Sequence, residues 1–172
     1  MELKYCETVA DSGYARDIQE LLKLADKEFI PPLSARGSST QQDFTGTDAI
    51  SQGAKAYYEA MSVQPVVMAL EGGRCYGFMA FKRDCVCQYY QKTPNLYAST
   101  CVVHPNARGK GLMKGFYQTM MELFPQCSIY TRTWHTNASH LKVLDKLGFS
   151  LLVRLPDHRG PGVDTVYYCR EV

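Results

Sequence analysis

The spacing of hydrophobic and polar positions changes along this chain, from a helical period in the first third to the short apolar runs of strands. Residues 2–9 predict a first strand. Apolar residues then recur every three or four positions between residues 18 and 29, so we expect a helix that ends at Pro31-Pro32. The polar residues 31–47 predict a mobile surface loop, and a second helix is expected over residues 48–61.

From residue 66 onwards, short apolar runs separated by turn residues indicate a sheet. Residues 71–74 predict a hairpin turn, and residues 85–90 are expected to extend the strand that follows it. One helix follows the segment Arg108-Gly109-Lys110-Gly111, and another runs to Leu147 from a cap at residue 136 or 137. The expected strands cover residues 66–70, 75–82, 96–103, 128–133, 149–155 and 164–170.

The predicted order of elements is β-α-α-β-β-β-α-β-α-β-β, which describes a mixed α/β fold. With 172 residues, the chain has the length of one domain with one sizeable core. No internal repeat or linker divides it. We therefore expect residues 1–172 to form a single domain, in which the glycine segment joins a central strand to a helix.

Composition argues against several classes of function. The net charge of +2 is too small to indicate nucleic acid, and no apolar run approaches the roughly 20 residues of a membrane span. The seven cysteines include no Cys-x-x-Cys pair, and Cys85-Val-Cys87 has no metal-ligand spacing to a histidine, so we expect no metal. The odd number of cysteines and the missing signal peptide favour a reducing cytoplasm.

The segment Arg108-Gly109-Lys110-Gly111 carries the most specific chemistry in the chain. The first amides of a helix have no partner within the helix and carry the positive end of its dipole. Glycines let an anion approach this backbone, and Lys114 adds a further positive charge within the same turn. The segment is interpreted as a phosphate or pyrophosphate site. The alternative is a solvated basic helix start whose glycines only form the turn.

Two common phosphate-binding folds do not fit this segment. A P-loop requires Gly-x-x-x-x-Gly-Lys-Ser/Thr, which is absent. A dinucleotide-binding fold requires Gly-x-Gly-x-x-Gly directly after a strand, and an acidic residue about 20 residues later. Here the third glycine, Gly115, is out of register, and residues 130–132 read Tyr-Thr-Arg.

Two motifs resemble those of the GNAT superfamily of N-acetyltransferases. The segment Val103-His104-Pro105-x-x-Arg108-Gly109-Lys110-Gly111 is similar to its acetyl-CoA signature. Asn137, followed eleven residues later by Gly148-Phe149, resembles its "Asn … Lys-Leu-Gly-Phe" helix. The resemblance covers essentially the whole chain. It implies a GNAT-like domain with a central mixed, largely antiparallel sheet of about seven strands flanked by about four helices.

The resemblance also implies which residues bind acetyl-CoA, the co-substrate. The backbone of residues 101–103 would pair with the pantetheine arm like an additional strand, and the amides of residues 109–113 would hold the pyrophosphate. Arg108 matches the first residue of the signature, and Asn137 matches the asparagine that contacts the coenzyme. His140 lies one turn after it. The predicted coenzyme-binding residues are Cys101, Val102, Val103, Arg108, Gly109, Lys110, Gly111, Leu112, Met113, Asn137 and His140.

Two positions depart from the family pattern. Met113 stands where the signature has Gly or Ala, and Leu144 stands where many members carry a tyrosine that protonates the leaving thiolate. A leucine cannot donate a proton, and its expected contact with Phe149 is structural. His140 shares a helical face with Leu144 and is the candidate catalytic acid. The alternatives for His140 are a coenzyme contact and a packed or surface histidine.

By this resemblance, a primary amine of a small molecule or peptide attacks the thioester directly in a ternary complex, after losing a proton. The amide of Val103 would stabilise the developing oxyanion. Cys101 is interpreted as a buried strand residue, with a covalent acyl-cysteine as the alternative. A non-catalytic coenzyme A-binding or sensing module, and an O- or other acyltransferase, remain open. A homodimer is compatible with the sequence.

The acceptor pocket is less specified than the coenzyme site. By the resemblance, residues 31–61 and 156–163 would shape it. Aromatic side chains could form one wall, and a carboxylate could attract a cationic amine. The candidates for these roles are Tyr57, Tyr58, Tyr89, Tyr90, Glu59 and Asp84.

Overall fold

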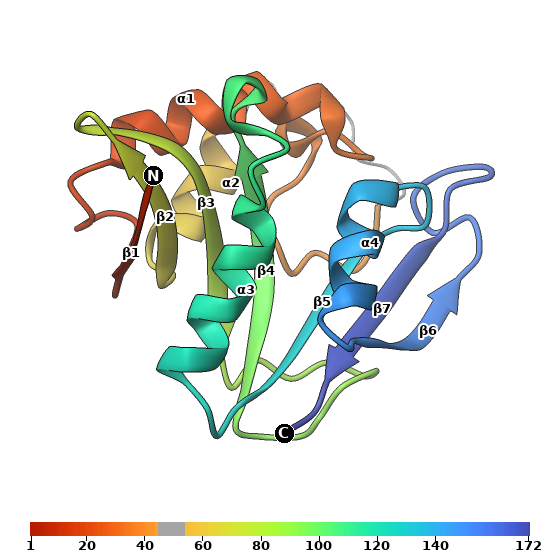
Figure 1. The fold of residues 1–172 in the computed structure, drawn as a ribbon. Coiled ribbons are helices and arrows are strands. Elements are labelled where there is room, and N and C mark those ends of the chain that lie inside the picture. Colours follow the sequence, from red (N-terminus) through yellow and green to blue (C-terminus); the bar gives the residue numbers. More distant parts are fainter. Residues whose placement is uncertain (45–53) are drawn as a thin grey trace.

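The computed structural model describes residues 1–44 and 54–172, which form one α/β domain with a single seven-stranded sheet (Figure 1). The strands follow the order β1-β2-β3-β4-β5-β7-β6, and β4 and β5 form the parallel pair in a sheet that is otherwise antiparallel. The predicted mixed, largely antiparallel sheet is confirmed. The strands are β1 (Glu2–Cys6), β2 (Val66–Glu71), β3 (Arg74–Arg83), β4 (Asn95–Val103), β5 (Ser128–Trp134), β6 (Ser150–Leu155) and β7 (Thr165–Arg170).

Four α-helices lie in the described part of the chain, two on each face of the sheet. Three short 3₁₀ helices connect the larger elements. None of the described helices has the length and apolar character needed to cross a membrane. The α-helices are α1 (Ala15–Ala25), α2 (Lys55–Ser62), α3 (Leu112–Leu123) and α4 (Ala138–Lys146), and the 3₁₀ helices are Asp26–Glu28, Leu33–Ala35 and Pro105–Ala107.

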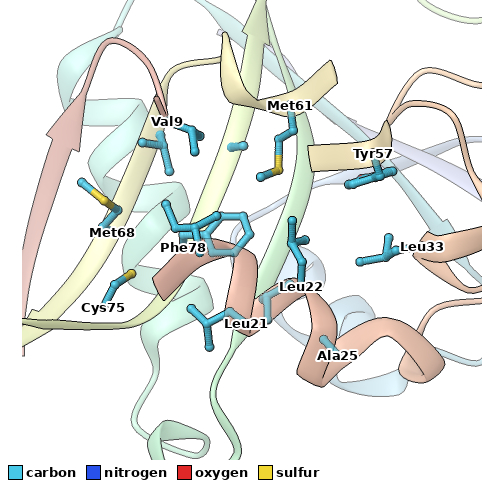
Figure 2. Close-up of a cluster of buried hydrophobic side chains, with 14 of the residues drawn as sticks. Val9, Leu21, Leu22, Ala25, Leu33, Tyr57, Met61, Met68, Cys75 and Phe78 are labelled. Carbon is cyan, nitrogen blue, oxygen red and sulfur yellow. The ribbon is translucent and has the colours of Figure 1, made fainter. Parts of the chain in front are cut away.

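Each face of the sheet has its own hydrophobic core. On one face, α1 and α2 pack through residues such as Leu22 and Met61 against Phe78 of β3 (Figure 2). On the other face, α3 and α4 pack through residues such as Phe116 and Leu144 against β2 to β5. The apolar residues that recur with helical spacing in the sequence therefore form the helix faces that pack on the sheet.

The two parallel strands separate before they end. β4 pairs with β5 only from Asn95 to Ala98, although β4 continues beside β3 as far as Val103 and β5 continues beside β7 to Trp134 (Figure 1). Ser99 is an extra residue in β4, because Ala98 and Thr100 pair with consecutive residues of β3. Such a bulge bends its strand. The C-terminal halves of β4 and β5 therefore expose backbone edges to each other.

The prediction of a mobile surface loop over residues 31–47 was wrong for the part that the structure describes. Leu33 is fully buried beside Tyr57 and Leu22 (Figure 2). Arg36 and Phe44 are also buried. The apolar residues in this polar segment are too far apart to form a helical or strand pattern, yet they anchor it. The remainder of the predicted loop, and the first residues of the predicted helix 48–61, lie outside the described residues.

The expected extension of β3 through residues 85–90 was also wrong. Asp84 adopts a positive φ of 47°, which ends the strand. Cys87 and Tyr90 then pair with each other in a tight turn. The alternating cysteines in this stretch imitate a strand pattern because each packs against the nearby tyrosine cluster.

Candidate functional site

A cavity of about 440 Å³ lies where β4 and β5 separate. Its wall is formed by α1 and the segment that follows it, β4, the glycine segment, α3, β5, the start of α4 and the β6–β7 loop. The predicted coenzyme-binding residues come together here, apart from Lys110, which is exposed outside the lining. The ones that line the cavity are Cys101, Val102, Val103, Arg108, Gly109, Gly111, Leu112, Met113, Asn137 and His140.

The glycine segment needs its glycines for backbone conformation. Gly109 and Gly111 have φ values of 75° and 76°, which disfavour any side chain. Gly111 caps the N-terminus of α3, and no side chain caps the helix amides there. A Cβ at either glycine would meet no atom within 4 Å, so the space in front of this backbone is open. Free helix amides facing open space form an anion site.

Gly115, the out-of-register third glycine, has a different purpose. A Cβ there would lie 2.9 Å from Leu3 Cδ1 of β1, so the absent side chain allows α3 to approach the sheet. The structure thereby explains why the three glycines do not follow the dinucleotide spacing.

The free edge of β4 presents backbone polar groups to the cavity. The carbonyl of Val103 accepts a hydrogen bond from Arg108 Nε at 3.1 Å, so it faces away from β3. In a strand, the N–H and C=O of one residue point the same way, and neighbouring residues alternate. Cys101 and Val103 therefore turn their backbone groups toward the gap, and Val102 turns its own toward β3.

The side chain of Arg108 forms its hydrogen bonds within the protein. Its Nη2 donates to both carboxylate oxygens of Glu28, at 2.9 and 2.8 Å, while Nε holds Val103. This bridge ties the end of β4 to the segment after α1. Arg108 therefore positions the cavity wall in this structure, and the positive charge of its guanidinium is largely offset by Glu28.

Asn137 forms the N-cap of α4. Its Oδ1 accepts from the amide of His140 at 3.4 Å, and its Nδ2 donates to Thr133 Oγ1 at 2.9 Å. The side chain thus joins β5 to α4 at the cavity wall. The predicted cap and the closing turn are both present, since Gly148 has a φ of 75° and the amide of Phe149 donates to the Leu144 carbonyl at 3.0 Å.

His140 is buried at the cavity wall, and its Nε2 lies 2.9 Å from the hydroxyl of Tyr117. Burial lowers the pKa of His140 to about 4, so the imidazole is neutral at pH 7. A neutral imidazole cannot donate a proton as a charged imidazolium would. The role predicted for His140 in catalysis stays a prediction. Because the buried ring is neutral, His140 can take part only as a neutral hydrogen-bonding partner.

Tyr117 is a functional candidate that sequence reasoning missed. It belongs to α3, lines the cavity with its hydroxyl against His140, and burial raises the pKa of its phenol, which stays protonated. Leu144, which occupies the expected tyrosine position, is fully buried in the core. The pattern of α3 gave no separate signal, because a tyrosine at helical spacing also fits a hydrophobic core.

Cys101 carries the only thiol on the cavity wall within the described chain. Burial raises the pKa of this thiol to about 12, so it is protonated at neutral pH. A protonated thiol is a weak nucleophile. The geometry therefore favours the interpretation of Cys101 as a packed strand residue over that of an acyl carrier.

The candidates for the acceptor wall do not line the cavity. Tyr57 is fully buried and its hydroxyl lies 2.7 Å from Thr100 Oγ1. Glu59 pairs with Lys55 on the surface, and Asp84 accepts from the amide of Asn95. Tyr58, Tyr89 and Tyr90 also lie outside the lining, in positions where aromatic side chains pack against the cores.

The cavity wall also contains three arginines that sequence reasoning did not single out. Arg36, Arg132 and Arg159 all line the cavity, from three distant parts of the sequence. The only local signal was Arg132, a charged residue in the middle of a strand. Among the described residues, no group of His, Cys, Asp or Glu could hold a metal ion.

Comparisons with known proteins give a family for the sequence. A sequence profile of the Acetyltransferase (GNAT) family matches residues 19–149, which is most of the chain. Among curated proteins, no sequence matches this one.

The fold also matches solved structures. One is yncA of Salmonella typhimurium with its cofactor acetyl-CoA, at a TM-score of 0.64 and 16% identity, covering 99% of this chain and 94% of that chain. A phosphinothricin acetyltransferase of Sinorhizobium meliloti in complex with AcCoA matches with a TM-score of 0.66, 17% identity and 99% and 88% coverage. The ribosomal-protein-alanine N-acetyltransferase of Brucella melitensis matches with a TM-score of 0.63, 14% identity and 100% coverage of both chains. At these identities the likeness concerns the fold.

Proposed function

The chain belongs to the GNAT family of acetyltransferases, and from this premise we propose that it transfers the acetyl group of acetyl-CoA directly to a primary amine of a small molecule or peptide. The observation that carries the proposal is the continuous cavity between the diverging strands. The open glycine turn and the free edge of β4 line one part of this cavity. Polar side chains on the other face of the sheet, such as Arg36 and Arg132, line the rest. A coenzyme and an acceptor could therefore meet in one space.

The residues around the cavity fit the parts of the coenzyme. The amides at the start of α3, exposed by Gly109 and Gly111, suit a pyrophosphate, and the exposed Lys110 adds charge nearby. The inward backbone groups of Cys101 and Val103 suit the amides of the pantetheine arm. Acetyl-CoA supplies the activated acyl group.

In the proposed reaction, the neutral amine attacks the thioester carbonyl carbon, a C–N bond forms and the C–S bond breaks. The amine loses one proton to solvent, and the sulfur leaves with its electron pair and takes up one proton. The amide of Val103, which faces the cavity, would donate to the carbonyl oxygen as negative charge develops.

We propose Tyr117 as the group that protonates the leaving sulfur, in place of the tyrosine that Leu144 replaces. Its phenol remains protonated because burial raises its pKa, and it lies on the cavity wall. If the proton of neutral His140 resides on Nε2, His140 donates to Tyr117 Oη, and the phenolic proton is available to Thr131 on the cavity wall or to the leaving sulfur. His140 would then be a positioning residue.

Direct attack is favoured over a covalent acyl-enzyme because the Cys101 thiol is protonated and no described base is hydrogen bonded to it. The finding that all seven cysteines are unpaired agrees with a reducing compartment, and we propose the cytoplasm.

A thiol-release assay with acetyl-CoA and a panel of primary amines tests this function. We expect free coenzyme A to appear only with an amine, and mass spectrometry to find the acetyl group on nitrogen. The second candidate is a coenzyme A-binding module, which the leucine at position 144 favours. Calorimetric binding of acetyl-CoA without amine-dependent release would support the module, and an ester product would indicate an O-acyltransferase.

A further inference from the structure

Three arginine side chains that line the cavity converge on one aromatic ring. The guanidinium carbons of Arg36, Arg132 and Arg159 lie 5.3, 5.2 and 5.1 Å from the centre of the Phe44 ring. They come from the segment after α1, from β5 and from the β6–β7 loop. Because three chain segments separated by many residues bring their cations together, this cluster is a product of the fold.

Two of the three arginines, Arg36 and Arg159, are buried, and Arg132 is half-buried. Arg36 is 6% exposed and Arg159 is 7% exposed. Among the described residues other than Asp43, no carboxylate forms an ion pair with any of the three. The carboxylate of Asp26 raises the pKa of Arg36, but its oxygens accept from the amide and hydroxyl of Ser34. Burying several positive charges together is costly, so an anionic ligand would be stabilised beside them.

Neutral acceptors hold each arginine in place. Arg36 donates from Nε and Nη2 to the Pro31 carbonyl, and Arg159 donates from Nε to Thr165 and from Nη1 to the Ile30 carbonyl. Arg132 Nη2 is held by the carbonyls of Ser39 and Gln41.

Two nitrogen atoms remain available. Arg36 Nη1 and Arg159 Nη2 have no hydrogen-bond partner in the described part of the chain, and neither is sealed inside the protein. Both residues line the cavity, so these donors lie on side chains that an acceptor in the cavity could contact.

Mutual repulsion contributes to the protonation equilibria of Arg36 and Arg159. Burial, together with the neighbouring Arg36 and Arg132, lowers the pKa of Arg159 to about 9. Burial also lowers the pKa of Arg36 to about 10, with Arg132 contributing. Both remain cationic at pH 7. An anion between them would relieve the repulsion and the desolvation together.

The cluster lies on the opposite face of the sheet from the predicted coenzyme-binding helices. Side chains alternate along β5, and Thr133 points toward α4, where its hydroxyl accepts from Asn137. Arg132 therefore points to the face covered by α1 and α2. The coenzyme phosphates are expected at the start of α3, so the cluster is suited to the other substrate.

We infer that the acceptor of this enzyme carries a carboxylate on the same small molecule as its primary amine, and that Arg36, Arg132 and Arg159 bind that carboxylate. The inference rests on the proposed function. A planar carboxylate matches the fork of a guanidinium and can accept from two arginines at once. Amines without an acid group, and cationic polyamines in particular, would bring no negative charge to the cluster.

The first test uses the wild-type protein and matched acceptors. The L-amino acids and short ω-amino acids are assayed by thiol release, each beside its own carboxamide. We expect kcat/KM for the preferred acid to exceed that for its amide by about 100-fold. Equal or faster turnover of the amides would overturn the inference and leave the proposed function standing.

A second test does not depend on turnover. The coenzyme A-loaded protein is titrated calorimetrically with butanoate and with butanamide. We expect butanoate alone to bind at millimolar concentration, and Arg36→Gln and Arg159→Gln to weaken it at least about tenfold without changing the Kd of acetyl-CoA. The matched control is Arg16→Gln, at a residue whose side chain is 92% exposed. Butanoate binding that is absent in wild type, or unchanged in both variants, would overturn the inference. If the variants fail to fold, the wild-type comparison decides alone.

Discussion

The two ends of the cavity are built in different ways. The proposed coenzyme end presents backbone groups from one short stretch, residues 101–113, together with the cap residue Asn137. The acceptor end uses side chains from three distant places, Arg36, Arg132 and Arg159. A backbone site depends on conformation and leaves a compact sequence pattern, whereas a side-chain site depends on tertiary packing. The family is therefore easy to identify from the first end, whereas the second end is where we propose that specificity is determined.

The largest effect is expected from Gly111→Glu, which breaks the coenzyme end. The new side chain and its negative charge would stand in the open space before the α3 amides, so the Kd of acetyl-CoA should rise by at least about 100-fold. Isothermal titration measures this change.

Gly13→Glu is the matched control for that change. Gly13 also has a positive φ, of 78°, and open space around its Cβ, but it lies outside the cavity. Both variants should lose about 1–2 kcal/mol of unfolding free energy from backbone strain. Only Gly111→Glu should lose binding, and equal binding by the two variants would contradict the coenzyme assignment.

The next effect concerns the point where the two ends meet. Tyr117→Phe removes the phenolic proton and keeps the ring in the core, so kcat should fall by about 100-fold with little change in the Kd of acetyl-CoA. Tyr57→Phe is the control, because Tyr57 is equally buried and hydrogen bonded but does not line the cavity. If kcat is equal in the two variants, Tyr117 is not the proton donor.

A smaller effect should appear in stability against pH. The folded-state pKa of His140 is about 4, below its ordinary value of 6.5, so the unfolded chain binds a proton more readily in this interval. Stability from His140 is present above pH 6.5 and is lost as pH falls toward 4. Wild type should lose up to about 2 kcal/mol more than His140→Asn over that range. Urea unfolding at a series of pH values measures the difference, and parallel curves would contradict a buried neutral imidazole.

The smallest effect is expected from Cys101→Ala. Only the backbone of Cys101 is assigned to the coenzyme, and its thiol is protonated, so kcat should stay within about threefold of wild type. Steady-state thiol release measures this. A loss comparable to that of Tyr117→Phe would point to an acyl-cysteine.

Much of the fold was predictable because its signals are local. Strand β2 is a nearly continuous apolar run, β4 and β5 are short segments bounded by turn residues, and α4 carries its cap at Asn137 and its closing glycine at Gly148. The stretch 85–90 was misread because alternation alone cannot distinguish a strand from a turn whose side chains pack.

The acceptor side was not predictable for a physical reason. Arg36 and Arg159 lie in irregular segments, and their burial depends on backbone carbonyls supplied by Pro31 and Ile30. Nothing in the local pattern of either segment distinguishes a buried arginine from a solvated one. Tyr117 escaped notice because its partner His140 belongs to another helix.

The central claim is that acetyl-CoA and the amine occupy the two ends of one cavity together, and initial-velocity kinetics with both substrates varied test it most directly. Double-reciprocal lines that intersect are the predicted result, because the acetyl group passes directly between substrates in a ternary complex. Parallel lines, with release of coenzyme A before the amine binds, would contradict the account and indicate an acyl-enzyme.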